Sequence, residues 1–328
     1  MNICVSTRET PAYTALPKFD SHIGAAYTGK GTSPNNHHFS FRRPSSEPSS
    51  SEQQTQKTFQ SNLAQLSATI GFNPSRVTLP NGPWPHSGQA IIAESESFRW
   101  IENPLTGALM PVTSTEDCEP VTYDGIVTKS KQFVLGIQGA DCPSIFLYDP
   151  EQNVISIAHA GWKPLVRGVV ANSIRMMEEL GAQSERVVAY VSPGCGDRYN
   201  CFHWDEAMES HIKEVFTDAR REEFSQDHSL RYVMTDADRR ELEGALGREI
   251  GDADATTFCL TVLVRRELEQ CGVRAENISW SDDSTVVTRY KDQEKGEERQ
   301  ELPPFQYHSY RRERPEHGLS MGVLFLKN

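Results

Sequence analysis

The stretches QFVLGIQGADCPSIFLYDP, residues 132–150, and NVISIAHAGW, residues 153–162, decide the fold of this chain. Both are near-continuous apolar runs of the kind found in fully buried strands, and a short turn around Asp149 and Pro150 separates them. We expect the two strands to lie side by side in one sheet. Cys142 would then lie next to His159 on a neighbouring backbone, and both side chains would face one cleft.

Helical and strand-like segments alternate on both sides of these two runs. The alternation lacks regular βαβ spacing and contains no internal repeat. Helices are predicted at residues 61–70, 163–182, 204–216, 237–250 and 254–272, and a final strand at residues 322–328. The pattern predicts an α+β fold, a layered α/β sandwich with mixed sheets that forms one domain.

The first part of the chain has a different composition. Residues 29–60, GKGTSPNNHHFSFRRPSSEPSSSEQQTQKTFQ, are rich in Ser, Thr, Gln, Asn and Pro and offer few apolar side chains to offset chain entropy. We therefore expect residues 1–58 to form a disordered or weakly ordered extension, with a short edge strand near residues 37–43. The folded domain would then span residues 59–328.

Charge and hydropathy exclude several classes of protein. The 328 residues include 33 Lys and Arg against 45 Asp and Glu, a net charge of -12. An acidic chain of this kind is a poor nucleic-acid binder, because such binding depends on neutralising phosphates. No apolar run approaches the roughly 18 residues that a membrane span needs. Nothing in the sequence sets the number of subunits.

The cysteines indicate a reducing compartment. They are odd in number, scattered, and without CxxC spacing, and no apolar leader precedes them, so we expect free thiols and a cytoplasmic protein. The seven residues are Cys4, Cys118, Cys142, Cys195, Cys201, Cys259 and Cys271.

Three residues from separate segments form a candidate metal site. His86 lies in the turn-rich segment PWPHSGQA, and Cys142 and His159 lie at the two strand ends. Taken singly, Cys142 is typical of a small buried side chain, and His159 of a core histidine. Together, one thiolate and two imidazoles are ligands that suit Zn²⁺, and a catalytic zinc site leaves its fourth position open.

The same motifs resemble a known family. ADCPSIFLYDP followed by ISIAHAGWK is similar to the signature pair of the laccase-domain family, which was long labelled multicopper polyphenol oxidase and is now associated with zinc-dependent purine nucleoside phosphorylases. YDGIVT, WPHSGQAI and HSYRR resemble further elements of that family. The resemblance covers roughly residues 60–328 and is strongest over 124–170.

The resemblance implies both an activity and a set of site residues. The implied reaction is phosphorolysis of adenosine, inosine or methylthioadenosine to the purine base and a ribose 1-phosphate, with adenosine deamination as an additional activity. The implied partners are a purine nucleoside and phosphate, and the implied cofactor is zinc rather than copper. The implied metal ligands are His86, Cys142 and His159, and the implied catalytic residues are Asp124, Asp141, Lys163 and Arg311, of which Lys163 and Arg311 would bind phosphate.

Two alternatives to this activity remain open. A multicopper oxidase needs roughly ten histidines in clustered His-x-His pairs, whereas this chain has 10 histidines and no such pair. The other alternative is a non-catalytic, metal-stabilised protein that binds a nucleoside or another protein. It is favoured by departures from the family pattern at residues 163–165 and 192–204, where His203 replaces a usual carboxylate and, with Cys201, offers a further metal contact.

Overall fold

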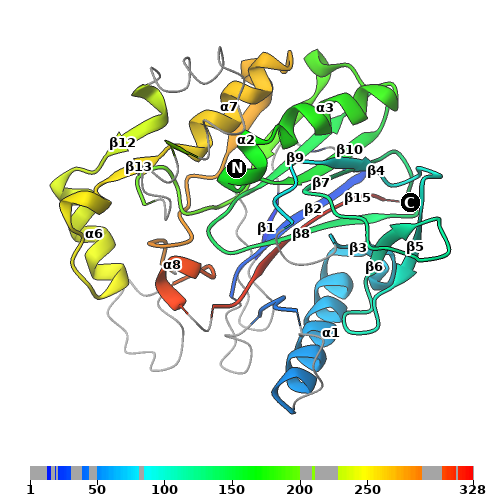
Figure 1. The fold of residues 1–328 in the computed structure, drawn as a ribbon, viewed down its shortest axis with the longest axis horizontal. Helices are drawn as coiled ribbons and strands as arrows, with labels where there is room; N and C mark the ends of the chain where they lie inside the picture. Colours follow the sequence, from blue (N-terminus) through cyan, green and yellow to red (C-terminus); the bar gives the residue numbers. More distant parts are fainter. Residues whose placement is uncertain are drawn as a thin grey trace.

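Two mixed β-sheets stack face to face in the computed structural model, and helices cover the outer faces (Figure 1). The structure describes residues 13–15, 19, 21–30, 39–43, 50–80, 85–199, 209–210, 228–289, 305–314 and 317–327. The expected α+β layered sandwich with mixed sheets is confirmed. Within these residues, no helix is long and apolar enough to cross a membrane.

The strands of each sheet come from distant parts of the chain. The seven-stranded sheet has the order β1 (Tyr13–Ala15), β2 (Ile23–Thr28), β15 (Ser320–Leu326), β8 (Val134–Gly139), β3 (Val77–Thr78), β6 (Leu109–Thr113) and β5 (Phe98–Glu102). The six-stranded sheet has the order β14 (Ile278–Trp280), β11 (Val188–Val191), β9 (Ser144–Asp149), β10 (Val154–His159), β7 (Gly125–Thr128) and β4 (Ala90–Ile92). β12 (Arg231–Val233) pairs with β13 (Thr256–Phe258) outside both sheets.

The helices described are α1 (Ser50–Ile70), α2 (Trp162–Val166), α3 (Val169–Glu179), α6 (Asp236–Leu246), α7 (Leu260–Gln270) and α8 (Tyr310–Glu313).

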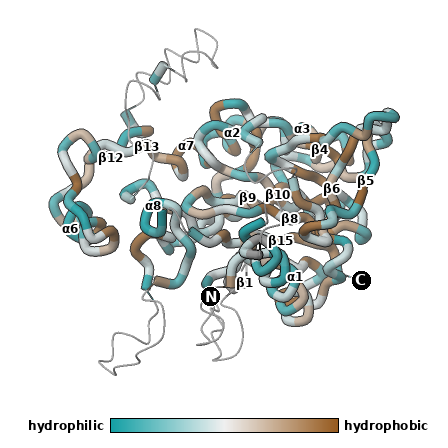
Figure 2. Tube along the Cα trace, turned by 60° about the horizontal axis from the view of Figure 1, so that its bottom comes forward, coloured by the Kyte–Doolittle hydropathy of each residue, from teal (hydrophilic) through white to brown (hydrophobic). Residues whose placement is uncertain are grey.

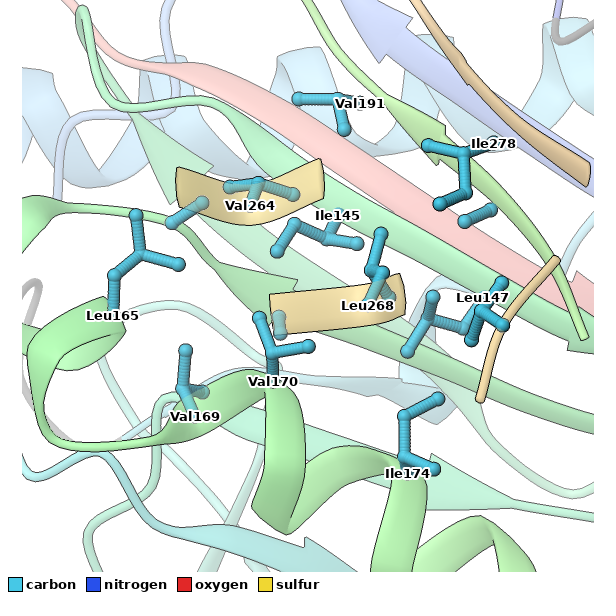
Figure 3. Close-up of a cluster of buried hydrophobic side chains, with 14 of the residues drawn as sticks. Ile145, Leu147, Leu165, Val169, Val170, Ile174, Val191, Val264, Leu268 and Ile278 are labelled. Carbon is cyan, nitrogen blue, oxygen red and sulfur yellow. The ribbon is translucent and has the colours of Figure 1, made fainter. Parts of the chain in front are cut away.

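Side-chain alternation along β9 explains the layers. Ile145 and Leu147 point to one face, where α3 and α7 pack (Figure 3). Phe146 and Tyr148 point to the other face and pack between the two sheets. Because successive side chains of a strand point to opposite faces, a strand that is apolar at every position must be covered on both sides.

The apolar run at residues 132–150 crosses from one sheet to the other. β8 belongs to the seven-stranded sheet and β9 to the six-stranded sheet. The break lies at Asp141, whose φ of 79° is in the left-handed region that non-glycine residues seldom adopt. The expectation that β9 and β10 are neighbours is confirmed, and the two strands are antiparallel, with Ser144 opposite His159.

Residues 1–58 were expected to form a disordered or weakly ordered extension, and their described parts pack against the seven-stranded sheet. β2 pairs with β15, the side chains of Phe39 and Phe41 are fully buried, and α1 begins at Ser50. The physical reason is that a few apolar residues, although widely spaced, fill the outer face of the seven-stranded sheet. Residues 39–43 do not form the predicted edge strand, and residues 1–12, 31–38 and 44–49 lie outside the described residues.

Three predicted helices are shorter than expected. The helix predicted at residues 237–250 is α6, which ends at Leu246. The segment 163–182 contains α2 and α3, which are separated at Gly168, a residue with a left-handed φ of 84°. The segment 254–272 begins with β13 and continues as α7. The predicted helix at residues 204–216 lies outside the described residues except at positions 209–210.

α6 stands at one end of the molecule, apart from the central hydrophobic strands (Figure 2). It packs through Leu242 against a small cluster that includes Cys195 and Val286. These two residues belong to loops that follow β11 and β14. The α6 region is therefore attached to one edge of the six-stranded sheet.

The turn that joins β9 to β10 depends on one buried carboxylate. Asp149 accepts hydrogen bonds from the backbone N–H groups of Glu151, Gln152 and Gln183 and pairs with Arg186 at 2.9 Å. Burial alone would raise the pKa of Asp149, but the hydrogen bonds from Arg186 and these N–H groups outweigh it and lower the pKa. The carboxylate thus stabilises the fold above the ordinary carboxyl pKa, and this contribution is lost as the pH falls through the lowered value.

We predict that Asp149→Ala lowers the free energy of unfolding by about 3 kcal/mol at pH 7. The cost should shrink below about pH 4, where the carboxyl of the unfolded chain becomes protonated, and continue to shrink as the pH falls through the lowered pKa of the native carboxylate. Urea unfolding at pH 7 and pH 3 tests both points. Glu151→Ala is the matched control, because Glu151 is 64% exposed and also contacts Arg186, so its loss should cost less than about 1 kcal/mol. Equal costs for the two variants would contradict the assignment.

Candidate metal centre

The candidate site lies at one edge of the six-stranded sheet. Strand register places the start of β4, the start of β7, the end of β10 and the start of β9 at this edge. The segments that lead into or out of these strands carry His86, Asp124, His159 and Cys142. The topology therefore gathers residues that span 73 positions of sequence, from His86 to His159, into one row.

Asp124 and His159 are paired twice. The backbone N–H of His159 donates to the carbonyl of Asp124 at 2.8 Å, and its Nδ1 lies 3.3 Å from Asp124 Oδ1. Both side chains are buried, and Nε2 of His159 has no hydrogen-bond partner. A carboxylate that holds one imidazole nitrogen leaves the other as an acceptor or metal ligand.

The other carboxylate oxygen of Asp124 holds the segment that carries His86. Oδ2 accepts from Ser87 Oγ at 2.9 Å and from the backbone N–H of Gly88 at 2.8 Å. Burial alone would raise the pKa of Asp124, but the hydrogen bonds from His159, Gly88 and Ser87 lower it. Asp124 is therefore a charged anchor for both histidine-bearing segments.

His86, Asp124 and His159 form a compact group. One potential ligand atom from each lies within 4.8 Å of the others, and the two imidazole rings are 5.9 Å apart. His86 has a left-handed φ of 51°, and its buried Nδ1 has no hydrogen-bond partner. Burial lowers the pKa of His86, as do the neighbouring His159, Lys163 and Arg167. The neutral imidazole, which can bind a metal, is thereby favoured.

Cys142 faces the same gap from the neighbouring strand. A Cβ atom placed on Gly161 would lie 3.1 Å from His159 Nε2 and 3.3 Å from Cys142 Sγ, so only the absence of a side chain at Gly161 keeps this gap open. Cys142 does not belong to the compact group of three, and burial raises the pKa of its thiol. The unpartnered His159 Nε2 and the adjacent sulfur fit a metal that prefers nitrogen and sulfur ligands.

Asp141 and Arg311 form a neighbouring pair. The buried Asp141 carboxylate accepts from Thr285 Oγ1 at 2.6 Å, from Ser309 Oγ at 3.1 Å and from the backbone N–H of Arg311 at 2.7 Å. Burial raises the pKa of Asp141. The guanidinium of Arg311 donates to the carbonyl of Tyr199. The side chain of Asp141 thus connects its own left-handed backbone, directly before Cys142, to the segment that contains Arg311.

Lys163 and Arg167 provide positive charge beside His86. Lys163 lies in α2 with its Nζ over the Trp162 ring, and Arg167 donates a short hydrogen bond to the carbonyl of His86. Lys163 was predicted from the sequence as a site residue, whereas Arg167 was not. The sequence feature that could have revealed Arg167 is its i, i+4 spacing from Lys163, which places both cations on one face of a helix.

The comparisons with known proteins identify the family. A family model described as "Multi-copper polyphenol oxidoreductase laccase" matches residues 44–327. The chain belongs to this family. The resemblance inferred from the sequence motifs is confirmed.

Curated relatives of this laccase-family chain are named for nucleoside chemistry. A purine nucleoside phosphorylase of Streptomyces coelicolor is 39% identical over 148 residues, 45% of this chain and 52% of that protein. One from Deinococcus radiodurans is 44% identical over 77 residues, 23% of this chain and 30% of that protein. An adenosine deaminase from an unknown prokaryote is 33% identical over 95 residues, 28% of this chain and 35% of that protein. The matched regions therefore span about half or less of these relatives.

Two solved structures share the fold. YfiH of Bacillus licheniformis superposes with a TM-score of 0.64 at 17% identity, with 98% of each chain covered. YlmD of Geobacillus stearothermophilus gives a TM-score of 0.62 at 14% identity, with both chains fully covered.

We predict that Asp124→Asn weakens metal binding about 10- to 100-fold. The amide still accepts from Ser87 and Gly88, but its NH₂ then faces His159 Nδ1 and forces the proton onto Nε2, which removes the ligand lone pair. Competition of Zn²⁺ against a chromophoric chelator measures the affinity. Thermal unfolding of the metal-free protein serves as the control. Unchanged affinity would mean that Asp124 does not orient His159.

Proposed function

We propose that the protein is a zinc-dependent purine nucleoside phosphorylase. It would cleave adenosine, inosine or methylthioadenosine with phosphate, yielding the purine base and ribose or methylthioribose 1-phosphate. The proposal rests on the geometry of His159. Its Nδ1 is held by Asp124, and its unpartnered Nε2 faces Cys142 across Gly161. The names of the relatives in Streptomyces and Deinococcus support the substrate class.

His86, Cys142 and His159 would hold the zinc ion. Two imidazoles and a thiolate are a common catalytic zinc set, and Asp124 would act behind His159 rather than as a fourth ligand. Bound zinc supplies Lewis-acid stabilisation of negative charge that develops on the substrate. A reducing compartment such as the cytoplasm would keep Cys142 available, in agreement with the free state of Cys118, Cys142, Cys195, Cys259 and Cys271.

The basic residues would position phosphate. In phosphorolysis a phosphate oxygen forms a bond to C1′ of the ribose while the glycosidic C–N bond breaks, and the base leaves with the electron pair. Lys163 and Arg167 lie beside His86, and Arg311 lies on the Asp141 side. Fixed cations of this kind stabilise the attacking dianion and hold it in line. Asp141 would position Cys142 and Arg311, since its carboxylate oxygens already accept three hydrogen bonds.

Adenosine deamination is the second candidate activity. One relative is named an adenosine deaminase, and the same site could direct water to a purine carbon with release of ammonia. Oxidation of phenols by several copper ions is disfavoured. The described residues contain one candidate group of metal ligands, and the full sequence has no His-x-His pair to build a second.

Chromatography of purified protein incubated with adenosine, inosine or methylthioadenosine tests the function. We predict that free base appears only when phosphate is present and that the protein carries about one zinc ion per chain. Inosine formed from adenosine without phosphate would instead establish deamination. Retained zinc with no turnover of any nucleoside would favour the non-catalytic alternative.

We predict that Cys142→Ala loses both zinc and at least about 99% of the activity, because a two-ligand site binds Zn²⁺ much more weakly. Elemental analysis after dialysis measures the zinc, and the same chromatography measures turnover. Cys118→Ala is the matched control and should keep both, since Cys118 lies in the loop after β6 and contacts Arg99. Full metal content in Cys142→Ala would refute the ligand assignment.

A further inference from the structure

The edge of the sheet that carries the metal centre continues past it. β11 is antiparallel to β9, with Val191 opposite Ile145, and β14 is parallel to β11, with Trp280 opposite Val191. The ends of β11 and β14 therefore lie in the same row as Cys142 and His159. Neighbouring strands are about 4.8 Å apart, so these ends lie about 10–15 Å from the end of β10.

A cavity of about 950 Å³ opens at the ends of β11 and β14, beneath α6. Its size is at the upper end of the range for small-molecule sites, about 300–1,000 Å³. Its lining includes Asp197, Tyr199, Glu241, Trp280, Asp282 and Arg289. None of these residues belongs to the metal centre.

The cavity reaches toward the metal centre. A smaller hollow of about 30 Å³ shares Asp197 and Trp280 with it and extends to Pro143, the residue after Cys142. The loop after β11 lies close to this point because it has no side chain at Gly194, where a Cβ would lie 2.9 Å from Pro143 Cδ. The two sites are thus neighbouring parts of one edge.

The charge of the cavity differs from that of the metal centre. Four carboxylates line it, those of Asp197, Glu241, Asp282 and Asp283, against the two guanidinium groups of Arg198 and Arg289. Lys163 and Arg167 instead place positive charge beside His86. An anion such as phosphate is favoured beside His86, whereas the cavity favours a neutral group rich in hydrogen-bond donors.

The cavity also offers an aromatic surface. Trp280 is 41% exposed, and Tyr199, whose hydroxyl donates to Glu241, lines the same space. The guanidinium of Arg265 lies over the Trp280 ring, 5.8 Å from its centroid, and the remaining exposed surface of the indole is suited to stacking against a planar ring. Carboxylates beside it can accept hydrogen bonds from the amino and ring N–H groups of a purine.

We propose that this cavity holds the purine base of the nucleoside, with the glycosidic bond directed toward the metal centre. This assignment rests on the proposed function and adds the orientation of the substrate. It also gives a specificity: the excess of carboxylates disfavours nucleotides, which carry additional phosphate, relative to nucleosides.

Steady-state kinetics of Trp280→Ala test the proposal. The KM for adenosine should rise about 10-fold, because one stacking contact is lost, while the KM for phosphate and the zinc content stay unchanged. Trp280→Phe should recover most of the loss, because it restores an aromatic face. An adenosine KM within twofold of wild type in Trp280→Ala would overturn the proposal.

Asp282→Asn supplies an independent test. Asp282 is exposed, so the variant should fold, and it should reduce the discrimination between adenosine and adenosine 5′-phosphate at least about threefold. Asp117→Asn, in the loop after β6, is the matched control and should leave the discrimination as it is. Unchanged discrimination in Asp282→Asn would count against the assigned charge preference.

Equilibrium dialysis with adenosine separates this inference from the proposed function. If wild-type protein turns over no nucleoside but binds adenosine, and Trp280→Ala weakens that binding, the phosphorylase proposal fails and the base site stands. If wild-type protein turns over adenosine and Trp280→Ala binds it equally well, the base site fails and the phosphorylase proposal stands. If wild-type protein binds no adenosine, both fail.

Discussion

The site depends on the carboxylate of Asp124. One oxygen faces the imidazole of His159, and the other accepts from Ser87 and Gly88, so a single buried charge connects β7, β10 and the segment before β4. The backbone hydrogen bond between His159 and Asp124 fixes the two strands at the same point. A buried charge is stable only when it is paired and hydrogen-bonded. Asp124 can therefore be buried only if His159 and the segment that carries His86 are held in these positions.

The edge of the six-stranded sheet divides into regions of opposite charge. His86, with Lys163 and Arg167 beside it, lies at the β7 and β10 end, and the carboxylate-lined cavity lies at the β11 and β14 end. Asp141 stands between them and joins the loop before Cys142 to the segment that carries Arg311. One edge of the sheet can therefore bind two chemically different groups, an anionic nucleophile and a neutral base.

The sequence predicted local features better than the connections between them. The pairing of β9 with β10 followed from two apolar runs and a short turn, and it correctly placed Cys142 close to His159. The split of residues 132–150 between two sheets was missed, because both halves are equally apolar and the break depends on the backbone conformation of Asp141.

Long-range packing was the part least accessible from sequence. Phe39 and Phe41 lie in a segment whose Ser and Pro content suggests disorder, and their burial depends on a sheet whose strands include β8 and β15, which come from distant parts of the chain. The base cavity combines residues 196–289, which no spacing rule links.

The position of β15 affects the order in which the sheets can assemble. It is the last described strand in the chain, yet it lies between β2 and β8 near the centre of the seven-stranded sheet. During synthesis, β2 and β8 leave the ribosome long before the strand that joins them, whereas β4, β7, β9, β10 and β11 can already pair with one another. The six-stranded sheet, which carries the metal centre, can therefore form on a nascent chain while the seven-stranded sheet is still incomplete. The apolar face that the six-stranded sheet turns toward its partner then stays exposed until translation reaches β15.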